Sequence, residues 1–133
     1  MAKTIQGIEQ GRADFAYQCA EIGSKSSKPK EYKSYVKKTP MMIKTNGLGA
    51  TLAFAMSKSK DGNTWALVYN QVSEWLQRAE NQYLINNQSG ELSEIIIGLK
   101  SRQYRAVTNE VLALFNWLRR FAEGLIEGED EQV

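Results

Sequence analysis

A run of apolar residues in the last third of the chain constrains the fold most strongly. From Val107 to Leu125 these residues recur in steps of four and three, which places them within an arc of about 80° on a helix. The segment from Ser101 onward is therefore predicted to form one long core helix. It spans only about two and a half heptads, so we interpret the apolar side as the seam of a bundle. The seam residues are Val107, Val111, Leu114, Leu118, Phe121 and Leu125.

Helical spacing also recurs through the rest of the chain. It is clearest from Trp65 to Leu76, where six apolar residues lie on one side of a predicted helix. A first helix is predicted over residues 3–22, with Ile5, Ile8, Phe15, Cys19 and Ile22 on its apolar side. Further helices are predicted over 28–45, 48–60 and 92–99, although the three isoleucines at 95–97 also fit a buried strand.

Pro40 leaves two courses open for the predicted helix over residues 28–45. Thr39 and Pro40 can start a new helix, or the proline can kink a continuous one, because it removes a backbone donor. In either case the chain is predicted to be all-α, a compact bundle of five to six helices. We expect one domain over residues 1–128 and an acidic C-terminal tail over 129–133.

Composition removes several classes of chemistry. The chain has no histidine, so catalysis by Ser-His or Cys-His pairs and histidine-ligated zinc are excluded. The single cysteine, Cys19, lies on an apolar helical stripe and is interpreted as a core thiol. We expect no catalytic residue, no metal site and no cofactor. The acidic residues that could build a carboxylate metal site are interpreted instead as parts of solvated faces, namely Glu74, Glu80, Glu91, Glu94 and Glu110.

The hydropathy of the chain predicts a soluble protein. No apolar run approaches the roughly 18 residues that a membrane span needs. The first ten residues, MAKTIQGIEQ, show neither an apolar core nor a cleavage site of a secretory signal. We therefore expect a cytoplasmic location and no contact with a membrane.

Positive charge is concentrated in one part of the chain. Between Lys25 and Lys60 there are nine lysines and one acid, Glu31, so these 36 residues carry a net charge of +8. The remaining 97 residues carry −6. A block of this kind inside helical sequence indicates a protein that meets polyanions.

The lysines of the predicted second helix fall on one side of it. If the helix continues through Pro40, Lys30, Lys33, Lys37 and Lys44 lie within about 60° of one another, and Lys38, Lys58 and Lys60 extend this ridge. Lysine suits sequence-independent contact with phosphates, because its ammonium group is a point charge on a flexible stem. A lysine face can also serve only to keep a protein soluble, and charge alone does not separate the two interpretations.

The last predicted helix carries a second polar strip. Its members project within about 100° of one another, away from the apolar seam, and are Arg102, Arg105, Asn109, Asn116, Arg119 and Arg120. Guanidinium and carboxamide groups are donors that suit phosphates and sugars. Leu112 lies on the same side, so this helix has more apolar surface than one packing face uses. Phe115 and Trp117 flank the seam and are expected in the core, whereas Leu112 is the better candidate for contact with a partner subunit.

Several motifs of this chain are similar in order and spacing to those of a known family. They are YVKKTP at 35–40, NGLG at 46–49, LAF at 52–54, the helix from Tyr69 to Leu76, and WLRRFA at 117–122. Together they resemble the small helical subunit of the Cmr complex, the type III-B CRISPR machine for RNA-guided interference. The likeness spans most of residues 30–125, and residues 1–29 and 78–100 contribute no motif to it.

The resemblance implies an all-helical subunit without catalytic activity that works in antiviral defence. Copies of such a subunit stack in the inner filament of the complex, beside its backbone and large subunits, and line the groove for guide and target RNA. Guide-target pairing would then read the sequence, and the protein would need only backbone contacts. From charge and resemblance together, the predicted nucleic-acid-binding residues are Lys30, Lys33, Lys37, Lys38, Lys44, Lys58, Arg102, Arg105, Arg119 and Arg120. The rival hypothesis is a purely structural adapter whose lysines meet an acidic protein partner.

Overall fold

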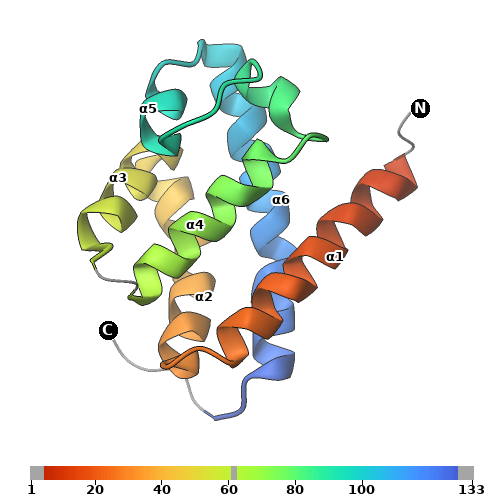
Figure 1. Cartoon of the computed structure of the whole chain (residues 1–133), viewed down its shortest axis with the longest axis vertical. Helices are drawn as coiled ribbons and strands as arrows, with labels where there is room; N and C mark the ends of the chain where they lie inside the picture. Colours follow the sequence, from red (N-terminus) through yellow and green to blue (C-terminus); the bar gives the residue numbers. More distant parts are fainter. Residues whose placement is uncertain (1–4, 61–62, 129–133) are drawn as a thin grey trace.

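A computed structural model describes residues 5–60 and 63–128 of the protein, and these residues form six α-helices without a β-strand. Figure 1 shows the helices gathered around α6. The predicted all-α bundle is thus confirmed. The acidic tail over 129–133 lies outside the described residues. The helices are α1 (Ile5–Ser24), α2 (Pro29–Asn46), α3 (Leu48–Lys58), α4 (Thr64–Gln77), α5 (Leu92–Ile97) and α6 (Ser101–Leu125).

Helix α6 packs against both α1 and α2, and its apolar seam forms the centre of the core. Val107, Val111, Leu114 and Leu118 are buried as predicted, and so is Phe115. The seam was predicted too long at its end, because Phe121 is only half-buried and Leu125 is exposed. Trp117 is also half-buried, and its ring stacks on Phe121 with 5.8 Å between the ring centroids.

Helix α4 follows its predicted pattern closely. The six apolar residues between Trp65 and Leu76 are all buried. Asn63 caps the helix, since its side-chain oxygen accepts a hydrogen bond from the backbone N–H of Ala66 at 3.0 Å. Strong periodicity and a local cap therefore agree, and this explains why the sequence predicts this helix well.

Helix α2 continues through Pro40, so the continuous course holds. Tyr32, Val36 and Ile43 pack into the core, and Tyr35 stacks on Trp65 with 4.2 Å between ring centroids. At its C-terminal end the helix stops at Gly47, whose φ of 93° favours glycine, and α3 begins directly afterwards. This sharp corner turns α3 away while α2 stays beside α6.

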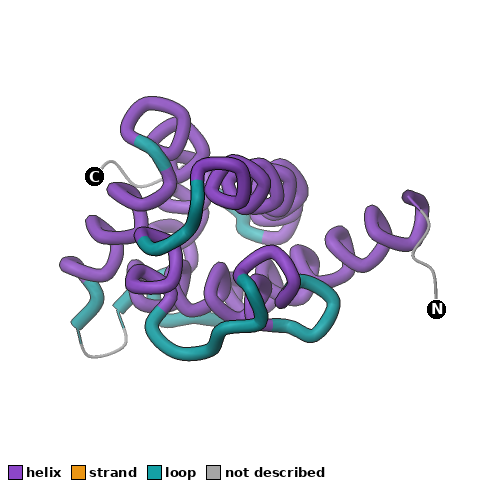
Figure 2. The backbone as a smooth tube through the Cα atoms, turned by 90° about the horizontal axis from the view of Figure 1, so that it is seen from above, coloured by secondary structure: helices purple, strands orange, loops and turns teal. Residues whose placement is uncertain are grey.

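Two predicted core residues of α1 are exposed instead. Ile8 lies in the N-terminal half of α1, which extends away from the other helices (Figures 1 and 2), and Ile22 lies in its last turn. The buried face of α1 is centred on the small residues Ala16, Ala20 and Gly23. Counting only large apolar residues misplaces such a face, because small residues mark where two helices approach most closely.

The close approach at Gly23 gives a direct test of this packing. A β-carbon at Gly23 would lie 2.2 Å from the ring of Tyr32, which is fully buried. We therefore expect Gly23→Ala to lower the free energy of unfolding by about 2 kcal/mol, because the core must shift to accept the methyl group. Urea unfolding measures this, and Gly11→Ala is the matched control, since nothing lies within 4 Å of a β-carbon there. Equal effects of the two substitutions would contradict the packing.

Cys19 is buried in the core, as predicted. Burial raises the pKa of its thiol to about 12, so the thiol stays protonated at neutral pH and is a poor nucleophile. Tyr32 donates a hydrogen bond to the backbone carbonyl of Cys19 at 3.1 Å and another to Gln71 at 2.6 Å. Burial also raises the pKa of the Tyr32 hydroxyl. This buried network joins α1, α2 and α4.

The segment between α4 and α6 holds a short helix that the sequence pattern missed. Residues Gln82–Ile85 form a 3₁₀-helix, which ends at Asn86 and Asn87, both with a φ of 57°. Asparagine tolerates this left-handed conformation better than most residues. In α5, Ile95 and Ile96 are buried but Ile97 is 74% exposed, so the triple isoleucine forms a helix and not a buried strand. No helix in the described part of the chain is long and apolar enough to span a membrane.

Candidate nucleic-acid interface

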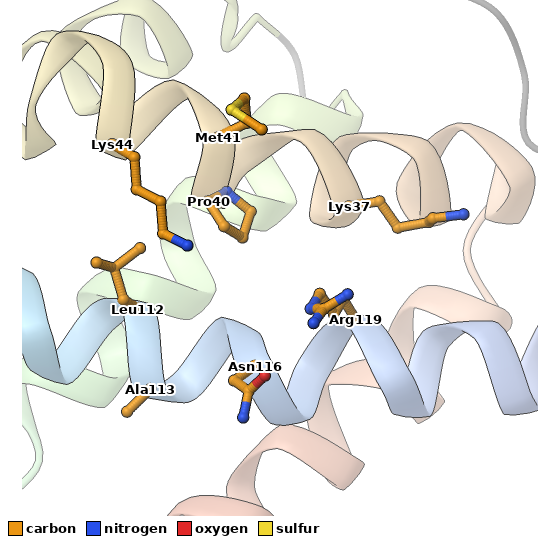
Figure 3. Close-up of a pocket in the computed structure, with 8 residues that line it drawn as sticks. All are labelled: Lys37, Pro40, Met41, Lys44, Leu112, Ala113, Asn116 and Arg119. Carbon is orange, nitrogen blue, oxygen red and sulfur yellow. The ribbon is translucent and has the colours of Figure 1, made fainter.

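A groove of about 540 Å³ lies between α2 and α6. Figure 3 shows its residues, which come from both helices. The lysine face of α2 and the arginine strip of α6, which are separate in the sequence, meet here. The lining residues are Lys37, Pro40, Met41 and Lys44 from α2, and Leu112, Ala113, Asn116 and Arg119 from α6.

Contacts at both ends of the groove fix how the two helices lie. The helices run in opposite directions (Figure 1). At one end the hydroxyl of Tyr104 accepts a hydrogen bond from the backbone N–H of Gly49 at 2.8 Å, which anchors the start of α6 to the start of α3. At the other end Lys37 pairs with Glu123 at 3.0 Å. Lys37 therefore lies opposite the C-terminal part of α6, and Lys44 lies opposite Leu112.

The charge of the groove is positive. Of its eight lining residues three are cationic and none is acidic. Glu123 reaches one end through Lys37, but the side chains of Glu123 and Lys37 are 50% and 37% exposed. An ion pair this exposed is weak and screened by salt, so a phosphate can replace the carboxylate. The groove therefore has the electrostatics of a site for a polyanion.

Lys33 is the main correction to the predicted lysine ridge. Its side chain is not on the outer face, because the residue is only 5% exposed. The ammonium group donates hydrogen bonds to the carbonyl oxygens of Ile126 at 3.2 Å and Gly128 at 2.6 Å. Cations near the end of a helix satisfy its last carbonyls and oppose its dipole. Lys33 thus holds the end of α6 against α2, and we no longer include it among the residues for RNA contact.

Lys30 lies beside the same segment but remains exposed. A β-carbon at Gly128 would come within 2.7 Å of the Cε atom of Lys30, so the chain after α6 passes directly over this stem. The chain after α6 thus covers the first half of the predicted ridge, and only Lys37 and Lys44 reach the groove.

Lys38 and Lys58 belong to a different part of the surface. The ammonium group of Lys38 lies 5.8 Å from the ring centroid of Tyr35, and that of Lys58 lies 5.8 Å from the ring centroid of Phe54. Both rings pack on Trp65. These two lysines therefore flank an aromatic cluster of α2, α3 and α4 and do not line the groove.

The remaining predicted arginines extend along α6. Arg102, Arg105 and Arg120 are exposed, and they are not among the residues that line the groove. Arg119 is half-buried, and its guanidinium group points into the groove beside Lys37 (Figure 3). Leu112, expected to contact a partner subunit, lines the groove as well.

Glu110 does not lie on a solvated face as predicted. Its carboxylate accepts hydrogen bonds from Arg12 at 2.8 and 2.9 Å and from the indole N–H of Trp75 at 3.0 Å. Hydrogen bonding to Glu110 raises the pKa of the Arg12 guanidinium, although burial opposes this. The pair ties α1, α4 and α6 together. A signal was present in the sequence, because Arg12 falls on the apolar stripe of its helix, where an unpaired charge would be costly.

Comparison with known proteins adds evidence from the whole chain. The profile of the family described as "CRISPR-associated protein (Cas_Cmr5)" matches residues 8–125. The chain is 30% identical over 122 residues to a protein of Thermus thermophilus named "CRISPR system Cmr subunit Cmr5", a likeness that covers 86% of this chain and 92% of that one. Its fold is similar to the crystal structure of a CRISPR-associated Cmr5 family protein from the same species. In that comparison the TM-score is 0.73 and the identity 27%, with 95% of this chain and 100% of the other covered.

Proposed function

Because the chain belongs to the Cas_Cmr5 family of CRISPR-associated proteins, we propose that it is a non-catalytic subunit of a Cmr complex whose basic groove contacts RNA. One observation supports the RNA contact more than any other. Lys37 and Lys44 of α2 and Arg119 of α6 come from distant parts of the chain, yet they converge on one groove without an acid in its lining.

The chemistry of these residues suits the sugar-phosphate backbone. Lysine offers a flexible point charge and arginine a planar fork, and both bind phosphate without reading the base sequence. Lys30, Arg105 and Arg120 are exposed on the same two helices and extend the positive surface beyond the groove. Contact of this kind is sufficient for a subunit of an RNA-guided complex, because base pairing with the guide supplies the specificity.

Contacts with neighbouring subunits are the second part of the proposal. An aromatic surface formed by α1 and α6 lies away from the groove residues, and it includes Tyr17, Trp117 and Phe121. Tyr17 is exposed, and its ring meets the edge of Phe121 with 5.3 Å between centroids. Exposed aromatic residues of this kind are enriched in protein interfaces. We assign this surface to neighbouring copies or to backbone subunits of the complex.

The test of RNA contact is a charge reversal inside the groove. Six cations, namely those of the groove with Lys30, Arg105 and Arg120, would give a slope of about −4 for log affinity against log salt with single-stranded RNA. The double variant Lys37→Glu/Lys44→Glu should flatten this slope to about −3 and weaken binding at least about tenfold near physiological salt. Fluorescence anisotropy with a labelled RNA over a salt series measures both quantities.

The matched control is Lys25→Glu/Lys100→Glu, which changes the net charge equally at two exposed lysines outside the groove. It should retain most of the affinity. The proposal fails if the groove variant binds RNA as tightly as the unchanged protein and with the same slope. Equal losses in both variants would show that only the total charge matters.

The rival adapter function predicts a different result for the assembled complex. If the lysines meet an acidic protein partner, the subunit should remain in a complex after nuclease digestion, and RNA should not crosslink to residues 30–60. Native mass spectrometry and crosslinking to a photoreactive target RNA distinguish the two functions.

A further inference from the structure

The groove between α2 and α6 contains more apolar surface than phosphate contact requires. Four of its eight lining residues are apolar, namely Pro40, Met41, Leu112 and Ala113. Met41 is 66% exposed, so its thioether is available to a ligand. Exposed apolar residues gathered in a concave site are typical of ligand pockets, and the volume of about 540 Å³ lies in their usual range.

The cations and the apolar residues occupy different parts of the groove. Figure 3 shows Lys44 beside Leu112 at one end, Lys37 with Arg119 at the other, and the ring of Pro40 between them. Lys37 and Lys44 are separated by seven residues, which is about 10.5 Å along the helix axis. The groove thus has charge at both ends and an apolar middle.

A nucleobase matches this arrangement better than a phosphate alone. Its faces are apolar, its edges carry hydrogen-bonding groups, and a guanidinium plane can stack on it. Asn116 is exposed at the groove, and its carboxamide can both donate to and accept from a base edge. We infer that the middle of the groove takes up one unpaired base of the bound RNA, between Pro40 and Leu112, while the cations at its ends hold the flanking phosphates.

This inference rests on the proposed contact with RNA and adds a contribution that salt does not screen. Phosphate binding depends strongly on ionic strength, whereas burial of a base against apolar side chains does not. The two contributions can therefore be separated by changing the RNA and the protein independently. The charge arrangement also favours a base within a strand over a free nucleotide, because a single phosphate can engage only one end.

The experiment compares an oligonucleotide of ordinary RNA with one of equal length in which every base is absent. Met41→Ala/Asn116→Ala alters two exposed residues of the groove, so the fold should be preserved. We expect this variant to bind ordinary RNA about fivefold more weakly and abasic RNA as well as before, with unchanged salt slopes. The control, Met56→Ala/Asn70→Ala, removes a similarly exposed pair outside the groove and should change neither affinity.

The outcomes separate this inference from the proposed function. If the charge reversal at Lys37 and Lys44 weakens both RNAs while Met41→Ala/Asn116→Ala weakens neither, or both equally, base uptake is wrong and backbone contact stands. If the charge reversal has no effect on either RNA, the proposed function itself fails. A mononucleotide such as AMP that binds as tightly as the oligonucleotide would also overturn the inference, because the groove would then serve a free nucleotide.

Discussion

Replacing Glu110 with alanine is expected to lower the free energy of unfolding by about 3–5 kcal/mol, because it leaves the buried charge of Arg12 without its main partner. The side chains of Arg12 and Glu110 are only 11% and 14% exposed, so water cannot compensate. Trp75 also loses the acceptor of its indole N–H. Chemical denaturation measures the loss as a lower midpoint with an unchanged slope.

A double variant shows whether the lost stability comes from the unpaired charge. Arg12→Leu/Glu110→Leu removes both charges and should be less destabilised than either single variant, since an apolar pair needs no partner. Glu94→Ala removes an exposed glutamate and is the control, with an expected change within about 0.5 kcal/mol. If Glu110→Ala behaves like Glu94→Ala, the pair does not hold α1 against α6.

Replacing Lys33 with methionine is expected to cost about 3 kcal/mol of stability, since two charge-assisted hydrogen bonds to the end of α6 are lost together. Methionine keeps much of the buried stem, so the loss reports on the ammonium group. The same variant should bind RNA with an unchanged salt slope, because Lys33 faces the carbonyl groups of Ile126 and Gly128. Urea unfolding and the salt series together give both readings.

Lys37→Met is the control for this prediction and should show the opposite pattern. Lys37 is exposed at the groove, so its loss should change stability by no more than about 0.5 kcal/mol but should reduce the salt slope. If Lys33→Met leaves the protein stable and reduces the slope for RNA, Lys33 faces the ligand and our assignment of the groove is wrong.

Much of the fold was predictable because helix formation depends on short-range spacing. The positions of α4 and α6 followed from apolar residues three and four apart, and the corner at Gly47 followed from a local glycine signal. The short 3₁₀-helix after α4 was missed because four residues are too few to show a period. Ile8 was misplaced because spacing alone does not show where a helix extends beyond its neighbours.

The candidate site was predictable only in part. Spacing along α2 correctly placed Lys37 and Lys44 on one side, and spacing along α6 did the same for Asn116 and Arg119. It could not show that these two sides face each other. It also placed Lys33 with the exposed lysines, because the angle of a side chain around its own helix does not reveal which segment covers it.

Residue order therefore determined the helices, the all-α class and the concentration of positive charge, since each depends on neighbours along the chain. Tertiary packing alone decided which cations remain available to a ligand. It turned α2 and α6 antiparallel, used Lys33 to close the end of α6, and left Lys37, Lys44 and Arg119 around an apolar groove. The physical reason is that burial and pairing of a charge depend on contacts between segments far apart in sequence, and helical periodicity carries no record of them.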